Sequence, residues 1–293
     1  MALKGRSFLT YAGLAALVLI WGSTWAAIRV SLEGIPPLLG VVLRFTLAGA
    51  LLLALAPVLG VRLGRSAVER RLWWVNALLT FTAAYSLINW AEMWMPSGLA
   101  AVLFATFPLF VAVMAHFFIP GERLRKSSLA GVLIGFIGVA VLFSEDLRAV
   151  GGSRTVLAAV LMLLSALSSA VAYVAVKRWG TGIHPLSISG VSMGLGALLA
   201  IPLAWMGEQE KAISFGMRPV LALVYLAVVG SALAFSIYYW LLRRLPATTL
   251  SLINYATPVV AVLIGTLWLG EPFTLRIFLG ALLVVAGVAI AVR

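Results

Sequence analysis

Residues 96–118 of the chain read PSGLAAVLFATFPLFVAVMAHFF, and residues 246–268 read PATTLSLINYATPVVAVLIGTLW. Both stretches begin with proline, carry a second proline twelve residues later, and are apolar almost throughout. A helix of about 20 mostly apolar residues is long enough to cross the hydrocarbon core of a bilayer. Because the two stretches keep the same spacing 150 residues apart, they indicate a membrane protein with an internal repeat.

The composition of the whole chain also favours a membrane protein. Of its 293 residues, 63% are hydrophobic and 10% are charged, and the mean hydropathy is +1.12. A soluble domain averages about 45–50% apolar and about 25% charged residues, so this composition excludes a soluble enzyme and a disordered protein. Long apolar runs favour helices over a membrane β-barrel, whose strands alternate in polarity.

Ten apolar ranges are each long enough for one transmembrane helix. The connections between them are short and leave no room for a soluble domain. We therefore predict an all-α integral membrane protein with ten transmembrane helices. The predicted helices are residues 8–31, 37–60, 72–95, 97–118, 127–144, 154–177, 185–206, 218–242, 246–268 and 274–292.

The repeat extends over both halves of the chain. The offset of 150 also relates Trp90 to Trp240, and several glycines keep an offset of 149. Two five-helix units follow, residues 8–144 and residues 154–292. Because five is an odd number, the second unit must enter the membrane from the opposite side. Such inverted repeats are common in secondary transporters, which generally bind substrate near the midplane between the halves.

The distribution of charge predicts the orientation in the membrane. If the N-terminus is cytoplasmic, 14 of the 21 Lys and Arg residues fall on the cytoplasmic side, 6 fall outside, and Arg44 lies within a span. Seven of the nine acidic residues then fall on the outer side. Lys and Arg accumulate in cytoplasmic loops, so both termini are predicted to be cytoplasmic.

Several other classes of function are excluded or made remote. The net charge of +12 does not indicate nucleic-acid binding, because no basic face or nucleic-acid-binding motif accompanies it. The chain has no cysteine and only two histidines, which leaves little for a metal site. No cofactor is expected. An intramembrane enzyme is the remote alternative, since it would need a nucleophile with a nearby base or a metal cluster.

Polar and aromatic side chains inside the spans are the candidates for a substrate site. Polar groups are costly beside lipid and should face the interior of the bundle. Trp21 and Trp25 are four residues apart and share one helical face, as do Tyr85 and Asn89. The alternative for such residues is a packing role. The predicted substrate-binding residues are Trp21, Thr24, Trp25, Tyr85, Ser86, Asn89, Trp90, Tyr238, Tyr239, Asn254 and Tyr255.

Four further residues have two interpretations each. Pro108 and Pro258 remove backbone donors, so the freed carbonyls either bond to neighbours and line a cavity or mark a simple kink. Arg44 either contacts a substrate head group or a gate, or has a structural role between helices, which is the favoured interpretation. His116 lies near the inner end of its span. It either forms part of a gate or contacts a substrate head group, or it has no function in transport.

The motifs of the chain resemble those of a known family over essentially the whole sequence. They are Trp21-Gly22, Arg44-Phe45, Pro96-Ser97-Gly98-Leu99-Ala100-Ala101, Gly121-Glu122-Arg123-Leu124 and Gly270-Glu271-Pro272, together with the two prolines above. The pattern is similar to that of the EamA family of the drug/metabolite transporter superfamily. This resemblance implies ten helices and the export of small metabolites, amino acids prominent among them, across the inner membrane of a bacterial cell.

The residue types inside the spans narrow the expected substrate. Trp and Tyr faces can hold an ammonium group, and Asn and hydroxyl groups can meet a carboxylate or an amine. The lining thus suits neutral amino acids, including bulky apolar and aromatic ones. A phosphorylated substrate would need several Lys or Arg residues at midplane. Efflux of quaternary cations coupled to protons is the alternative within transport.

The energy source and the partners are predicted from what the spans contain. Glu92 is the one acid expected within a span, and it lies near the outer end, so facilitated diffusion is preferred over antiport. The expected partners are a small-molecule substrate and the lipid bilayer, with the protein a monomer or a weak homo-oligomer.

Overall fold

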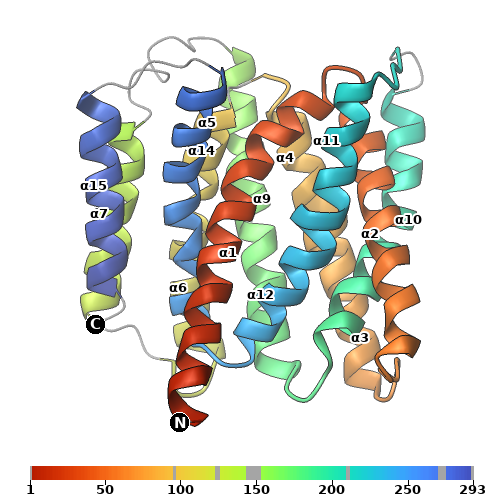
Figure 1. Ribbon diagram of the computed structural model, residues 1–293, viewed down its shortest axis with the longest axis horizontal. Helices are drawn as coiled ribbons and strands as arrows, with labels where there is room; N and C mark the ends of the chain where they lie inside the picture. Colours follow the sequence, from red (N-terminus) through yellow and green to blue (C-terminus); the bar gives the residue numbers. More distant parts are fainter. Residues whose placement is uncertain are drawn as a thin grey trace.

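The protein is a bundle of helices packed side by side, as the computed structural model shows (Figure 1). The structure describes residues 2–94, 97–122, 126–142, 153–208, 212–269 and 275–291. Within these ranges every regular element is a helix, which confirms the predicted all-α class. The motif residues Pro96, Arg123, Leu124 and Gly270-Glu271-Pro272 lie outside the described residues.

The helices follow the predicted ranges closely. The first half contains α1 (Ala2–Ser31), α2 (Pro37–Val58), α3 (Ala67–Asn76), η1 (Ala77–Ala84), α4 (Tyr85–Ala91), α5 (Ser97–Phe104), α6 (Phe107–Phe118) and α7 (Lys126–Leu142). The second half contains α9 (Ser153–Trp179), α10 (Pro185–Glu208), α11 (Met217–Ala227), η2 (Val228–Leu233), α12 (Ala234–Leu242), α13 (Ala247–Ser251), α14 (Ile253–Leu269) and α15 (Leu275–Ala291).

Five of these helical units are long and apolar enough to cross a membrane. They are α1, α2, α9, α10 and the continuous unit formed by α11, η2 and α12. Shorter apolar helices, α6 among them, fill other predicted ranges. The length and apolar composition of these helices support a membrane-spanning chain, and the count of ten spans stays a prediction.

A π-helical segment interrupts one helix in each half, η1 in the first and η2 in the second. Such segments shift the backbone hydrogen-bond ladder and are frequent at functional sites. Side chains of other helices bond to carbonyls in both segments. Ser168 donates to the Leu79 carbonyl at 2.7 Å, and the Trp21 indole donates to the Gly230 carbonyl at 3.3 Å. These side chains satisfy backbone groups that have no water to bond inside a membrane.

Glycines allow the closest approaches between helices. A methyl group added to Gly49 of α2 would lie 2.9 Å from the Gly194 nitrogen of α10. The packing of α7 on α15, at one edge of the bundle in Figure 1, is tighter still, because a methyl group added to Gly287 of α15 would lie 2.5 Å from the Gly135 nitrogen of α7. Small residues of this kind let membrane helices pack through their backbones.

One end of the bundle carries both ends of the chain (Figure 1). The start of α1 and the end of α15 lie there. The last turns of α12 reach the same end, because Ile237 and Leu241 of α12 lie against Gly13, which is in the first half of α1. We call this end of the bundle the terminal end.

Candidate functional site

A cavity lies among helices of both halves. Helices α1, α4, α5 and α6 with η1 contribute from the first half, and α9, α12 and α14 contribute from the second. The sixteen lining residues include no Asp, Glu, Lys, Arg or His. They are Trp21, Thr24, Trp25, Ile28, Thr80, Tyr85, Ile88, Phe104, Phe107, Ser169, Tyr173, Phe235, Tyr238, Tyr239, Asn254 and Thr257.

Aromatic side chains form a chain of contacts around this cavity that starts and ends on α1. Its successive ring-centroid distances are 5.9 Å for Trp25–Phe104, 5.7 Å for Phe104–Phe107, 5.6 Å for Phe107–Tyr173, 5.4 Å for Tyr173–Tyr238 and 4.8 Å for Tyr238–Trp21. Aromatic rings at such separations stabilise one another by about 0.5–1.5 kcal/mol per pair beyond their burial. The rings therefore form a connected wall that can stack on an apolar or aromatic ligand.

Backbone carbonyls fix the polar side chains of the wall. The Thr24 hydroxyl donates to the Trp21 carbonyl at 2.8 Å, and Asn254 donates to the Ser251 carbonyl at 3.0 Å. The Thr257 hydroxyl donates to the Asn254 carbonyl at 3.2 Å. That carbonyl has no helical donor because Pro258 lacks an N–H. The freed carbonyl at residue 254 thus bonds to a neighbour, whereas Pro108 lies in the first turn of α6, where a proline removes no helical bond.

Seven of the eleven predicted binding residues line the cavity, and four do not. The seven are Trp21, Thr24, Trp25, Tyr85, Tyr238, Tyr239 and Asn254. On α4 the cavity face is set by Tyr85 and Ile88, three residues apart, and each residue turns the helix by about 100°. Ser86 and Asn89 are each one residue further along and are therefore rotated away from the cavity.

Each of the four other residues has a packing environment of its own. Ser86 is buried, and Asn89 donates to the Tyr85 carbonyl at 2.8 Å. Tyr255 is wholly buried, and its ring lies beside Gly135 of α7. Trp90 is half-buried, and its indole lies near Gly207 of α10.

The cavity also contains residues that the sequence prediction missed. Helix α9 was not among the predicted contributors, yet it supplies Ser169 and Tyr173. These residues are four apart, which is the same face-sharing pattern that was applied to Tyr85 and Asn89. The phenylalanines of the wall gave no such signal, because a Phe inside a span is equally suited to face lipid.

Arg44 lies behind the cavity wall and is 3% exposed. Its Nε donates to the Ser231 hydroxyl at 2.7 Å, and its Nη2 donates to the Gly230 carbonyl at 3.4 Å. The guanidinium carbon is 4.8 Å from the centre of the Tyr85 ring. Arg44 therefore joins α2 to the π segment η2 and supports Tyr85 from behind, which favours the structural interpretation.

The two other ionisable residues singled out in the sequence also lie outside the cavity wall. His116 is exposed near the end of α6, with its ring 5.0 Å from that of Phe117. Glu92 follows α4 and is wholly buried, and neither carboxylate oxygen has a hydrogen-bond partner in the described part of the chain. Arg29 donates to the backbone carbonyl of Glu92 at 3.2 Å.

Comparison with known proteins identifies what this helical bundle is similar to. The model of a family described as "EamA-like transporter family" matches residues 9–144 and again residues 156–293. The uncharacterized inner membrane transporter YedA of Escherichia coli (strain K12) is 33% identical over 261 residues, covering 87% of this chain and 81% of YedA. A Streptantibioticus cattleyicolor protein named a probable terminal-alkyne amino-acid exporter is 30% identical over 284 residues, covering 96% of this chain and 92% of the exporter.

The fold is also similar to a solved one. A protein crystal structure superposes on the chain with a TM-score of 0.82 at 23% sequence identity. The match covers 97% of this chain and 96% of the other. At this level of identity the likeness concerns the fold alone.

Proposed function

The chain belongs to the EamA-like transporter family, and from its uncharged aromatic cavity we propose that this membrane transporter exports neutral amino acids. The observation that carries the proposal is the cavity wall, which combines a connected set of aromatic rings with Asn, Ser, Thr and Tyr groups and contains no charged side chain. Such a wall suits bulky apolar and aromatic substrates that carry no net charge. The relative named as an amino-acid exporter supports the same substrate class.

Each part of a zwitterion has complementary groups in this cavity. Tyr hydroxyls and the Asn254 amide can bond to a carboxylate or an ammonium group. The faces of Trp21, Trp25 and Tyr238 can hold an ammonium by cation–π attraction. An anionic phosphate ester would find no fixed positive charge in the wall.

The proposed architecture has ten transmembrane helices in two inverted repeats, residues 8–144 and 154–292, in a bacterial inner membrane. Two matches to one family model and a π segment in each half support this division. Both termini are proposed to be cytoplasmic, on the evidence of the Lys and Arg distribution. Alternating access then requires the cavity to open in turn at the terminal end and at the opposite end.

Transport into proteoliposomes tests the substrate class directly. Purified protein should give saturable uptake of labelled leucine, phenylalanine and tryptophan down their gradients, with no uptake in protein-free vesicles. A quaternary amine should not compete at similar concentration. Uptake of the quaternary amine alone would overturn the amino-acid proposal in favour of a cation efflux carrier.

The proposed energy source is the substrate gradient, because no acidic or basic side chain lines the cavity. Glu92 could contradict this, because it is wholly buried and its carboxylate oxygens have no hydrogen-bond partner in the described part of the chain. Replacing Glu92 with glutamine keeps the side-chain volume, so uptake without a pH gradient is expected to stay within about twofold of the unmodified protein. An imposed pH gradient should change neither rate. Loss of both uptake and substrate-driven proton flux in Glu92→Gln would show instead that this carboxyl group couples transport to protons.

The absence of cysteine from the chain makes the orientation easy to measure. Arg62, in the exposed turn after α2, and Ile213, in the exposed stretch before α11, lie on opposite sides of the membrane in the proposed topology. In whole cells, a membrane-impermeant maleimide should label Ile213→Cys and should leave Arg62→Cys unlabelled until the membrane is opened. The reverse pattern would invert the proposed orientation.

A further inference from the structure

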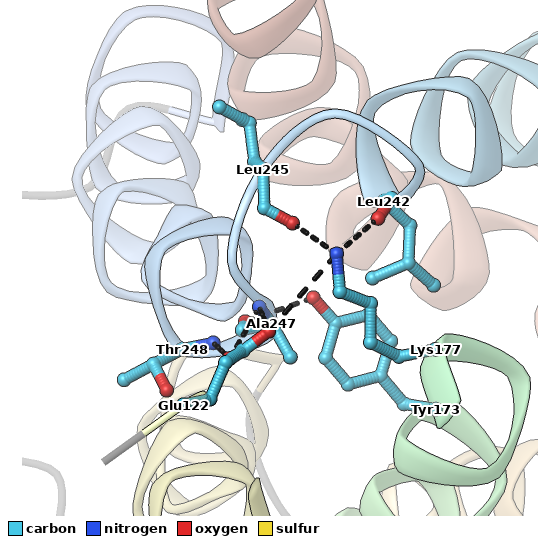
Figure 2. Close-up of polar contacts among 7 residues, drawn as sticks. All are labelled: Glu122, Tyr173, Lys177, Leu242, Leu245, Ala247 and Thr248. Carbon is cyan, nitrogen blue, oxygen red and sulfur yellow. Dashed lines mark hydrogen bonds and ion pairs between the residues drawn. The ribbon is translucent and has the colours of Figure 1, made fainter. Parts of the chain in front are cut away.

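A cluster of polar contacts ties four segments together at the terminal end of the bundle (Figure 2). The Glu122 carboxylate, just beyond α6, accepts from the Ala247 nitrogen at 2.8 Å and from the Thr248 nitrogen at 3.4 Å. These are the first N–H groups of α13, which have no acceptor within their own helix. We call Glu122, Lys177 and the backbone groups that they contact the Glu122–Lys177 cluster.

Lys177 of α9 completes the cluster. Its Nζ donates to the Leu242 carbonyl at 2.7 Å and to the Leu245 carbonyl at 2.6 Å, and it lies 4.0 Å from Glu122. One ammonium group therefore holds both sides of the turn between α12 and α13 (Figure 2). Both charged side chains are largely buried, at 19% exposure for Lys177 and 13% for Glu122, which strengthens contacts that would be weak on a surface.

Tyr173 connects the substrate cavity to this cluster. Its ring lines the cavity, and its hydroxyl donates to the Ala247 carbonyl at 2.8 Å. The same residue, Ala247, gives its N–H to Glu122. Tyr173 and Lys177 are four residues apart on α9 and so face the same way. A ligand that contacts Tyr173 in the cavity is therefore connected, through the Tyr173 side chain, to the residue at the start of α13 that Glu122 holds.

The cluster also lies between two hollows. A second hollow, outside the central cavity, is lined by Lys177, Leu242 and residues 180–183. Tyr239 lines both hollows. The turn between α12 and α13, which Lys177 and Glu122 hold, thus belongs to the partition between the cavity and the terminal end.

We propose that Tyr173 is the positioning residue through which bound substrate releases the closed terminal end of the transporter. In the closed state its hydroxyl holds α13 against α9. A substrate carboxylate oxygen that accepts from the same hydroxyl replaces the Ala247 carbonyl, and the start of α13 is then held by Glu122 and Lys177 alone. This inference rests on the proposed function, because it takes the cavity to be the substrate site.

The experiment measures opening of the terminal end with a cysteine probe. Ser251→Cys places a thiol on α13, at a wholly buried position outside the cavity wall, in a chain with no other cysteine. Its labelling by an impermeant thiol reagent is followed from the side of the terminal end, with and without leucine. With Tyr173 present, labelling should be slow and should accelerate when leucine is added. With Tyr173→Phe, the loss of one hydrogen bond of about 1 kcal/mol should raise labelling without leucine about fivefold, and leucine should add little.

Two further variants separate this role from simple loosening of the bundle. Tyr225→Phe removes another interhelical tyrosine contact, that with Ser23, away from the cavity wall and the cluster, and it should leave labelling unchanged. Glu122→Gln weakens a charge-assisted cap and should raise labelling about tenfold or more while leaving the response to leucine smaller. The Michaelis constant for leucine in Tyr173→Phe should change less than the labelling does, because bound substrate exchanges one hydrogen bond of the Tyr173 hydroxyl for another and the variant lacks both.

The proposal would be overturned if Tyr173→Phe were labelled no faster than the protein with Tyr173, or if Tyr225→Phe were labelled as fast as Tyr173→Phe. It would also be overturned if Tyr173→Phe showed a large rise in the Michaelis constant for leucine and no change in the rate of labelling. If Tyr173→Phe does not fold, Glu122→Gln with unchanged labelling is the contradicting result. The labelling without substrate needs no amino-acid transport, so failure of the proposed function is distinguishable from failure of this inference.

Discussion

Replacing Trp21 with alanine is expected to lower amino-acid uptake at subsaturating substrate by about tenfold or more, which corresponds to about 1.4 kcal/mol. Trp21 packs on Tyr238 at 4.8 Å and on Phe235 at 5.4 Å, and its indole donates to the Gly230 carbonyl. The alanine variant removes a ring from the cavity wall and leaves that carbonyl without its indole donor. The loss should appear mainly in the Michaelis constant for aromatic substrates, measured in proteoliposomes.

Trp90→Ala is the matched control for this prediction. Both tryptophans were predicted to bind substrate, but only Trp21 lines the cavity, whereas Trp90 lies near Gly207. Uptake by Trp90→Ala, normalised to the amount of folded protein, should remain within about twofold of the unmodified protein. Equal losses in the two variants would mean that the cavity described by the sixteen residues is not the transport site.

The contrast between these two residues shows what the sequence could predict. Hydrophobic runs and the repeat spacing identify a helical membrane transporter, because apolar length and charge placement act over whole helices. Which face of a helix points inward depends on its rotation. On α4 a shift of one residue separates Tyr85, in the wall, from Ser86, outside it.

Helix α9 shows a second limit of sequence reasoning. Ser169 and Tyr173 lie in a largely apolar run, and their four-residue spacing indicates a shared face without distinguishing a face that packs on another helix from one that lines a cavity. Only the folded structure brings the carbonyl of Ala247, 74 residues further along the chain, to the hydroxyl of Tyr173. The Gly121-Glu122 motif could be found in the sequence, but its partners at the start of α13 could not, because the contact joins the two halves.

A substitution at Gly287, where α15 packs on α7, is expected to lower the stability of the protein. A methyl group added at this position would lie 2.5 Å from the Gly135 nitrogen and 2.7 Å from the Gly131 carbonyl oxygen. These are backbone atoms, so the helices themselves must separate. Gly287→Ala is therefore expected to destabilise the protein by about 1–3 kcal/mol, as overpacking does elsewhere. The measurement is the midpoint of thermal unfolding of the purified protein in detergent.

Gly194→Ala is the matched control, because it makes the same substitution in a helix where the added methyl group has space. A methyl group at Gly194 of α10 would meet nothing within 4 Å. Alanine favours a helix interior over glycine by about 0.5–1 kcal/mol, so this variant should unfold at an equal or higher temperature. Since both changes carry the same helix propensity, any difference between their midpoints reports the contact of α7 with α15. If Gly287→Ala were as stable as Gly194→Ala, the two helices would not pack through their glycines.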